Sequence, residues 1–216
     1  MSQEEIMSLI KNMLVISGET GKIFLLTLVF SLPLGLLVCL GRMSKLVIIS
    51  WPIRFFLLIM RGTPLILQLY VCFYGLPFFT PFKFDRFTAA LIAMSLNYAA
   101  YFAEIYRSGL ESMPKGQKEA AEVLGFTKNQ TFFKITLPQV IKRILPPMSS
   151  EFMTLVKDTA LVSVIGVAEI YQLATENMSF TGSMLPIALA GLFYLVMNSV
   201  VARCFYVAEK KLSYYQ

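Results

Sequence analysis

Residues 119–138 have the sequence EAAEVLGFTKNQTFFKITLP and form a polar segment between long apolar stretches. Good and fair helix formers fill positions 116–124, so the sequence predicts a short helix there. Gly125 predicts the C-terminal end of that helix. Ala120 and Ala121 are small, so another surface can approach their backbone closely. The segment is therefore either a docking element or a solvated connection, and its composition fits both.

The residues that follow predict a second helix. Thr136, Leu137 and Pro138 are typical of a helix start, because proline is tolerated in the first turn. Pro146 and Pro147 predict the end of this helix before the next apolar stretch.

The composition of the whole chain indicates an integral membrane protein. The 216 residues are 56% hydrophobic and only 15% charged, and the mean hydropathy is +0.66. A soluble domain carries about 25% charged residues. The net charge of +6 is not gathered into basic blocks with interleaved aromatic residues, which argues against nucleic-acid binding.

Several kinds of chemistry lack their residues. The chain has three widely spaced cysteines and no histidine, so we expect no metal site and no cysteine–histidine nucleophile. The stretch SGETGK at 17–22 has the wrong spacing for a phosphate-binding loop, and isoleucine follows its lysine where serine or threonine is needed. The polar, acidic start does not resemble a cleavable signal peptide. We therefore expect no cofactor and no enzymatic activity in this chain.

The apolar stretches predict five membrane-spanning helices, because about 20 apolar residues cross the hydrocarbon core. The fourth is the weakest, since it contains Glu151, Lys157 and Asp158. The predicted spans are 23–41, 62–82 with an extension over 55–60, 87–103, 149–168 and 177–202. Thr63 and Pro64, at the start of the second span, predict a kink or a helix start.

The basic residues predict the orientation of these spans. Lysine and arginine gather around the first and third connections and after the last span, whereas the connection after the fourth span carries only Glu169 and Glu176. By the positive-inside rule the N-terminus is outside and the C-terminus is in the cytoplasm. Only an odd number of spans satisfies this pattern.

Four motifs resemble those of ABC importer permeases. Glu119-Ala120-Ala121, Gly125 and the Ile135, Leu137, Pro138 group have the spacing of that family's cytoplasmic signature. Three further stretches resemble the polar amino-acid branch of the family, although Ala160 stands where serine is common. They are residues 61–65 with Gln68, residues 97–101 with Glu104, and residues 157–166.

The resemblance implies an all-α, type I importer permease in a prokaryotic cell membrane, with residues 1–216 as one domain and a coupling segment at about 111–147. Two permease subunits, identical or sister chains, would assemble with two ABC ATPase subunits, which bind ATP and magnesium, and with an extracytoplasmic amino-acid-binding protein. The resemblance also implies that Glu119 pairs with a basic ATPase residue and that Gly125 permits a sharp turn. Ala120, Ala121 and Leu124 would be packing contacts.

Two polar stripes predict a path for the substrate. Asn97, Tyr101 and Glu104 share one side of their helix, and Glu151 and Asp158, seven residues apart, share a side of theirs. Carboxylates inside a span default to functional candidates. They would accept the ammonium group of an amino acid, and three acids favour a cationic or zwitterionic substrate. Asn97, Thr159 and Ser163 are candidate donors to its carboxylate.

Structural roles explain the same residues in other ways. Lys157 is a partner for Glu151 or Glu104, and Arg107 is a partner for Glu104 or Glu111. Arg61 is either an anchor at the cytoplasmic interface or a gate near the inner mouth.

A different function is a secondary transporter or channel that works without an ATPase. In that case the acids would be proton or sodium sites. A non-transporting scaffold is a further alternative, but it would not need polar stripes on two helices.

Overall fold

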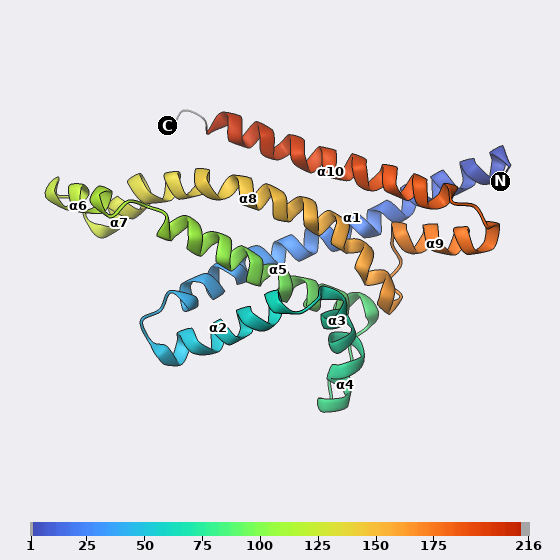
Figure 1. The fold of residues 1–216 in the computed structure, drawn as a ribbon, viewed down its shortest axis with the longest axis horizontal. Helices are drawn as coiled ribbons and strands as arrows, with labels where there is room; N and C mark the ends of the chain where they lie inside the picture. Colours follow the sequence, from blue (N-terminus) through green and yellow to red (C-terminus); the bar gives the residue numbers. More distant parts are fainter. Residues whose placement is uncertain (1, 213–216) are drawn as a thin grey trace.

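The structure is a computed structural model that describes residues 2–212, and within that range it is helical with no strands (Figure 1). The α-helices are α1 (Gln3–Arg42), α2 (Val47–Gly62), α3 (Leu65–Tyr70), α4 (Leu76–Phe79), α5 (Arg86–Glu111), α6 (Lys115–Val123), α7 (Lys128–Thr131), α8 (Leu137–Asp158), α9 (Ile170–Thr181) and α10 (Leu185–Lys211). Two π-helical turns, Val71–Gly75 and Phe132–Thr136, and one 3-10 helix, Thr159–Ile165, connect some of them.

The long helices run along the long axis of the molecule (Figure 1). The central one is α5, which packs against α1, α2, α3 and α8, while α10 packs on α8. At one end lie α6 and α7, and at the other lie α9 and the start of α1. The segment α3–α4 projects sideways from this bundle. The polar segment and α9 are therefore at opposite ends of the molecule.

Small residues let α1 and α5 approach closely. A Cβ atom on Gly35 of α1 would lie 3.0 Å from the Ala99 carbonyl oxygen and from the Phe102 Cβ. Alanines at several α5 positions, including Ala99, Ala100 and Ala103, are fully buried in this region. Such small-residue contacts are typical of helix packing in membranes, where close backbone approach replaces the hydrophobic driving force.

The predicted second span is not one continuous helix. Helix α2 ends at Gly62, and the axis turns by 110° before α3 continues from Leu65. The residue before a proline is disfavoured in helical geometry, and Thr63 is extended with ψ 147°. The expected kink or helix start at Thr63-Pro64 is confirmed. It separates the 55–60 extension, which belongs to α2, from the helical backbone that runs from Leu65 to Phe79.

Two prolines follow π-helical turns. The amide of Leu76 bonds to the Val71 carbonyl and the amide of Leu137 to the Phe132 carbonyl, each five residues back, and a proline follows at once. A wider turn accommodates a residue that has no N–H and that crowds the preceding turn. Helical backbone therefore precedes Leu137 from Lys128 onward, so the predicted fresh start at 136–138 is only partly right.

The predicted helix end at Pro146 and Pro147 is wrong. Helix α8 continues through both prolines to Asp158. Proline removes one backbone hydrogen bond and kinks a helix, but neighbouring helices preserve it when they pack against it. Helices α5 and α10 pack along α8 and supply that support.

The boundaries of three other predicted spans also change. Helix α1 begins at Gln3, capped by Ser2 in a reciprocal pair with Glu5, so it is far longer than 23–41. The fourth span narrows from α-helix to 3-10 helix at Thr159 and ends at Gly166, where φ is +75°. The predicted last span is divided at Gly182, where φ is +64°, because this left-handed conformation ends α9.

Helices α1 and α10 are long and apolar enough to cross a membrane, and the bent pair of α2 with the α3–α4 segment would be a third candidate if it is one span. Helix α5 does not meet the same standard, and neither does α8. Helix α8 carries Lys142, Arg143, Glu151, Lys157 and Asp158.

Candidate functional site

One cavity of about 350 Å³ unites residues of both predicted polar stripes. Asn97 and Tyr101 of α5 line it together with Glu151 and Asp158 of α8. The stripes therefore face each other, as the predicted path requires. The remaining residues of its wall are Thr63, Pro64, Leu65, Tyr98, Thr154 and Leu161.

Asp158 has a partner that the sequence analysis did not single out. The hydroxyl of Tyr98 donates a hydrogen bond to an Asp158 carboxylate oxygen at 2.8 Å, which connects α5 to α8. Tyr98 is fully buried, so this hydroxyl has little access to water. Two features of the sequence pointed to Tyr98. It belongs to the 97–101 motif, and a carboxylate inside a membrane needs a hydrogen-bond donor.

Glu151 is the acid with unused bonding capacity. It is half-buried on the cavity wall, and it makes no hydrogen bond or ion pair with any residue of the range 2–212. The expected pairing with Lys157 is therefore not formed. One turn away on the same wall, Thr154 donates its hydroxyl proton to the Ser150 carbonyl at 3.0 Å. The carboxylate of Glu151 is thus available to a cationic group inside the cavity.

Asn97 is engaged in holding the break between α2 and α3. Its amide nitrogen donates to the Met60 carbonyl and to the Gln68 side-chain oxygen, both at 3.0 Å. Gln68 in turn donates to the Met60 and Thr63 carbonyls at 3.0 and 3.2 Å. The bend leaves backbone carbonyls without helical partners, and the two amides satisfy them.

Glu104 lies outside this cavity, within a cluster of arginines. Its carboxylate is 2.7 Å from Arg107, 3.6 Å from Arg61 and 3.8 Å from Arg42. The expected pairing of Arg107 with Glu104 and Glu111 is formed, at 2.7 and 2.5 Å respectively. A single carboxylate among three guanidinium groups is an ion-pair centre.

The arginine cluster borders a second cavity of about 500 Å³. Arg42, Arg54 and Arg61 line it, with Glu104 as its acidic residue. Tyr101 belongs to the walls of both cavities. The chain thus has an acidic cavity and a basic cavity on either side of one tyrosine ring.

Two predicted donors are placed elsewhere. Thr159 is fully buried and donates to the Val156 carbonyl at 2.7 Å, while Ser163 donates to the Ala160 carbonyl at 2.7 Å. Neither lines the acidic cavity. Thr159 directly follows Asp158 and Ser163 lies five residues after it, so neither shares the side of the helix that Glu151 and Asp158 form.

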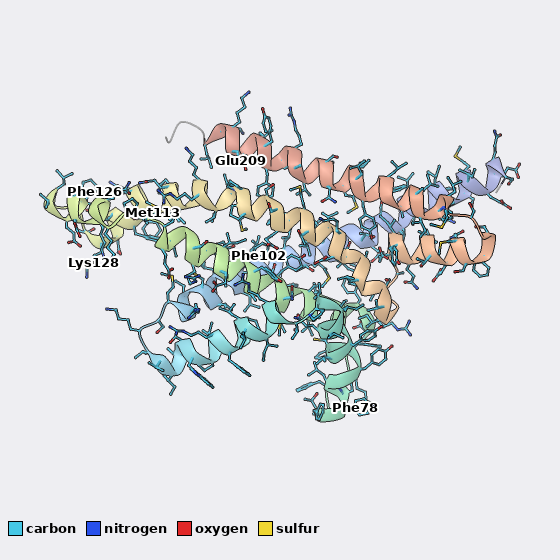
Figure 2. The ribbon with its side chains drawn as sticks, viewed as in Figure 1. Phe78, Phe102, Met113, Phe126, Lys128 and Glu209 are labelled. Atoms are coloured by element: carbon cyan, nitrogen blue, oxygen red, sulfur yellow. The ribbon has the colours of Figure 1, made fainter. Side chains whose placement is uncertain are left out.

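The predicted coupling residues lie on or beside α6 at one end of the molecule, where Figure 2 labels Phe126 and Lys128. Glu119, Ala120, Leu124 and Gly125 are exposed, and Gly125 has φ +80° after the last helical turn. Ala121 differs from them because it is 1% exposed and packs within the chain. The short helix and its glycine stop are confirmed.

No group of three or more histidine, cysteine, aspartate or glutamate residues that could hold a metal ion occurs within residues 2–212. The three cysteines are unpaired thiols.

Comparison with known proteins places these features in a family. Residues 31–214 match the family model described as "Binding-protein-dependent transport system inner membrane component". The arginine transport system permease protein ArtQ of Bacillus subtilis is 38% identical over 194 residues, 89% of each chain. The octopine transport system permease protein OccM of Rhizobium radiobacter is 39% identical over 194 residues, 84% of this chain and 79% of that one.

Solved structures agree in fold. The crystal structure of an amino acid ABC transporter with histidines contains a chain of similar fold, with a TM-score of 0.84 and 32% identity, and the match covers 95% of this chain and 97% of that one. An inward-facing MetNI methionine ABC transporter matches with a TM-score of 0.73 over 98% and 99% of the two chains. At 18% identity this second likeness concerns the fold alone.

Proposed function

The chain belongs to the family of binding-protein-dependent transport system inner membrane components, and we propose that it is the permease subunit of an ATP-driven importer of polar, preferentially cationic, amino acids. The permease has no catalytic role of its own. It provides the passage, while a separate ATPase hydrolyses ATP.

The single observation that carries the substrate class is the composition of the acidic cavity. Glu151 and Asp158 line it, and its wall contains no lysine or arginine. A buried carboxylate without a partner favours the binding of a cation over that of an anion. Tyr98 already uses the Asp158 carboxylate, so Glu151 is the primary partner for a substrate ammonium or guanidinium group. Proteins named for arginine and octopine transport among the relatives support this preference.

The other predicted path residues contribute less directly to substrate binding in this proposal. Tyr101 supplies an aromatic face beside the acids. Asn97 shapes the wall by holding the α2–α3 bend, while Thr159 and Ser163 stabilise the 3-10 segment behind it. Glu104 takes part through the arginine cluster at the inner mouth.

We also propose five membrane crossings, with the N-terminus outside and the C-terminus inside. Besides α1 and α10, the bent α2–α4 segment, α5 and α8 with its 3-10 extension would cross. Polar residues of α5 and α8 face the cavity and each other, so these two helices can cross the bilayer without exposing those residues to lipid. Basic residues around α6 and at the end of α10 support the cytoplasmic placement of that end.

In this proposal the partner ATPase binds α6. Its exposed side, with Glu119, Ala120 and Leu124, is what a groove on a partner needs, and Gly125 allows the chain to reverse after it. We propose that closure of two ATPase subunits pulls on this helix in each of two permease subunits. The spans then alternate between outward and inward access, and a loaded binding protein docks on the outer connections at 77–86 and 169–183.

Uptake by the complete importer tests the proposal. The chain would be reconstituted in proteoliposomes with its ATPase and binding protein, and uptake of radiolabelled arginine, lysine, glutamine and glutamate would be compared. We expect ATP-dependent uptake that prefers cationic amino acids. Uptake without any ATPase would support a secondary transporter instead and contradict the proposal.

Glu151→Gln sharpens the test of the substrate class. We expect the uptake of a cationic amino acid at low concentration to fall by about 10- to 100-fold, because a charge-assisted bond contributes roughly 1.5–3 kcal/mol. Glu209→Gln is the matched control, since Glu209 is exposed near the end of α10 and lies outside both cavities and outside the proposed docking segments. An unchanged apparent affinity in Glu151→Gln would contradict the substrate role of that carboxylate.

A further inference from the structure

The acidic and basic cavities share one lining residue. Tyr101 is the side chain common to both walls. The backbone divides at the same level, because Gly62 lines the basic cavity and Thr63 lines the acidic one. Tyr101 therefore lies where the two cavities adjoin.

Arg61 of α2 contacts the shared residue Tyr101. Its guanidinium carbon lies 5.4 Å from the centre of the Tyr101 ring, within the range of a cation–π interaction. The same guanidinium group is 3.6 Å from a Glu104 oxygen. Arg61 therefore joins α2 to two residues of α5, one aromatic and one acidic.

The α5 side of this contact is held in place independently of Arg61. Glu104 accepts hydrogen bonds from Arg107, which lies one turn later on the same helix and which also pairs with Glu111. The side chain of Arg61 is the longer-reaching member, and it remains 43% exposed. Release of the contact therefore requires movement of Arg61 and leaves Glu104 paired.

Arg61 also occupies a place where movement is expected. It lies in the last turn of α2, two residues before Thr63 and the 110° bend. A change in the angle between α2 and α3 moves Arg61 relative to Tyr101, because no further helical turn separates Arg61 from the bend. Short segments at the ends of helices commonly absorb such changes.

We propose that Arg61, stacked on Tyr101 and paired with Glu104, is the gate between the acidic cavity and the basic cavity, on the cytoplasmic side of the substrate path. This inference rests on the proposed function. A cationic group that leaves Glu151 meets the Tyr101 face and the Glu104 carboxylate, and both of these bind cations in general. The substrate thus competes with Arg61 for its two partners and helps to open the gate.

Thiol accessibility tests the gate directly. Thr154 lines the acidic cavity, so Thr154→Cys would be introduced into the chain after Cys39, Cys72 and Cys204 have been replaced by alanine or serine. Inside-out vesicles that contain the whole importer would be treated with the membrane-impermeant cation MTSET. We expect Arg61→Ala to increase the rate of modification about tenfold, the factor that corresponds to about 1.4 kcal/mol.

The controls separate a lost barrier from a lost charge. Arg54→Ala removes a positive charge from the same basic cavity, but no ion pair or ring contact joins Arg54 to Tyr101 or Glu104 within residues 2–212. We expect it to change the rate less than twofold. Tyr101→Phe preserves the aromatic face and is expected to leave the rate unchanged, whereas Tyr101→Leu is expected to raise it like Arg61→Ala.

Equal rates in Arg61→Ala, Tyr101→Leu and the parent chain would overturn the gate. So would an increase of the same size in Arg54→Ala, since charge alone would then explain it. The measurement needs no amino-acid substrate. The labelling result is therefore independent of the uptake result. Uptake can prefer cationic amino acids while the labelling shows no gate, and the labelling can show a gate while uptake has no such preference.

Discussion

The short helices at the two ends of the molecule, α9 and α6, are held in opposite ways (Figure 1). Helix α9 is tied down at its start by Glu169, which is fully buried, accepts backbone hydrogen bonds from Tyr171 and Gln172 at 2.8 and 2.6 Å, and accepts the Tyr194 hydroxyl at 2.5 Å. Helix α6 has one buried residue, Ala121, while Val123 and Leu124 are 88% and 74% exposed.

The difference separates a helix completed by its own chain from one that is not. The backbone amide of Ile170 also bonds to Thr20 of α1 at 3.3 Å, so α9 is connected to both α1 and α10. Exposed aliphatic side chains on a short polar helix gain from burial against another protein. We therefore expect substitutions in α9 to lower stability and substitutions on the exposed side of α6 to impair coupling.

The largest expected effect is on coupling at α6. Glu119→Lys and Gly125→Asp should each reduce ATP-driven uptake about a hundredfold, because a reversed charge or a blocked turn at an interface costs roughly 2–5 kcal/mol. Gly125 has φ +80°, which other residues rarely adopt. Uptake and ATPase activity would be measured together on reconstituted importer.

Membrane insertion and thermal stability of these two variants serve as the control. Insertion of both variants should match the parent chain, and so should the thermal stability of Glu119→Lys, because Glu119 is exposed. Gly125→Asp should lose only about 1 kcal/mol of stability, the strain of a side chain at φ +80°. Normal uptake in both variants would refute the docking role of α6.

At the other end, Glu169→Ala should lower the free energy of unfolding by about 2 kcal/mol, since it leaves the Tyr194 hydroxyl and two backbone amides without their acceptor. Thermal unfolding of the purified chain in detergent measures this. Glu176→Ala, in the same helix but exposed, should change it little. If the two variants were equally stable, α9 would not depend on its buried cap.

A smaller effect separates the two alanines of α6. Ala121→Val should destabilise the local packing by about 1.5 kcal/mol because overpacking strains a filled site. Ala120→Val, on the exposed side, should leave stability unchanged and weaken ATPase binding. Hydrogen exchange of α6 and co-purification with the ATPase distinguish the outcomes. Identical behaviour of both variants would contradict the assignment of opposite sides.

The smallest effect concerns the attachment of α6 to α8. The side chains of Gln117 and Gln139 exchange two hydrogen bonds, each of 3.1 Å. Gln117→Leu should cost about 1 kcal/mol and speed hydrogen exchange in α6 without affecting α9. An equal change in α9 would show that the two ends are not independent.

Local features of the structure were predictable from local sequence. The α6 helix, its stop at Gly125 and the break at Thr63-Pro64 follow from residue propensities, and all three are found. Glu151 and Asp158 face one cavity because α8 is regular between them. Earlier in the same helix, Pro146 and Pro147 predicted an interruption that does not occur. Support from α5 and α10 preserves the helix there, and no property of residues 146–147 alone indicates that support.

The site was predictable only where regular periodicity holds. Asn97 and Tyr101 line the cavity as their spacing predicts. Thr159 and Ser163 do not have the spacing of Glu151 and Asp158, and their hydroxyls donate to backbone carbonyls instead. Glu104 has the correct spacing for the stripe, yet it lies among arginines from α1, α2 and α5.

The sequence by itself determined that this is a helical membrane chain with a short polar helix before Gly125 and acids on one side of α8, because composition and local periodicity carry that information. The tertiary structure alone decided which polar groups meet. Tyr98 and Asp158 are 60 positions apart, Asn97 and Met60 are 37 apart, and Arg61 reaches Glu104 across two helices. In a low-dielectric interior each such group requires a partner, and the bends and packing of the helices select which one it finds.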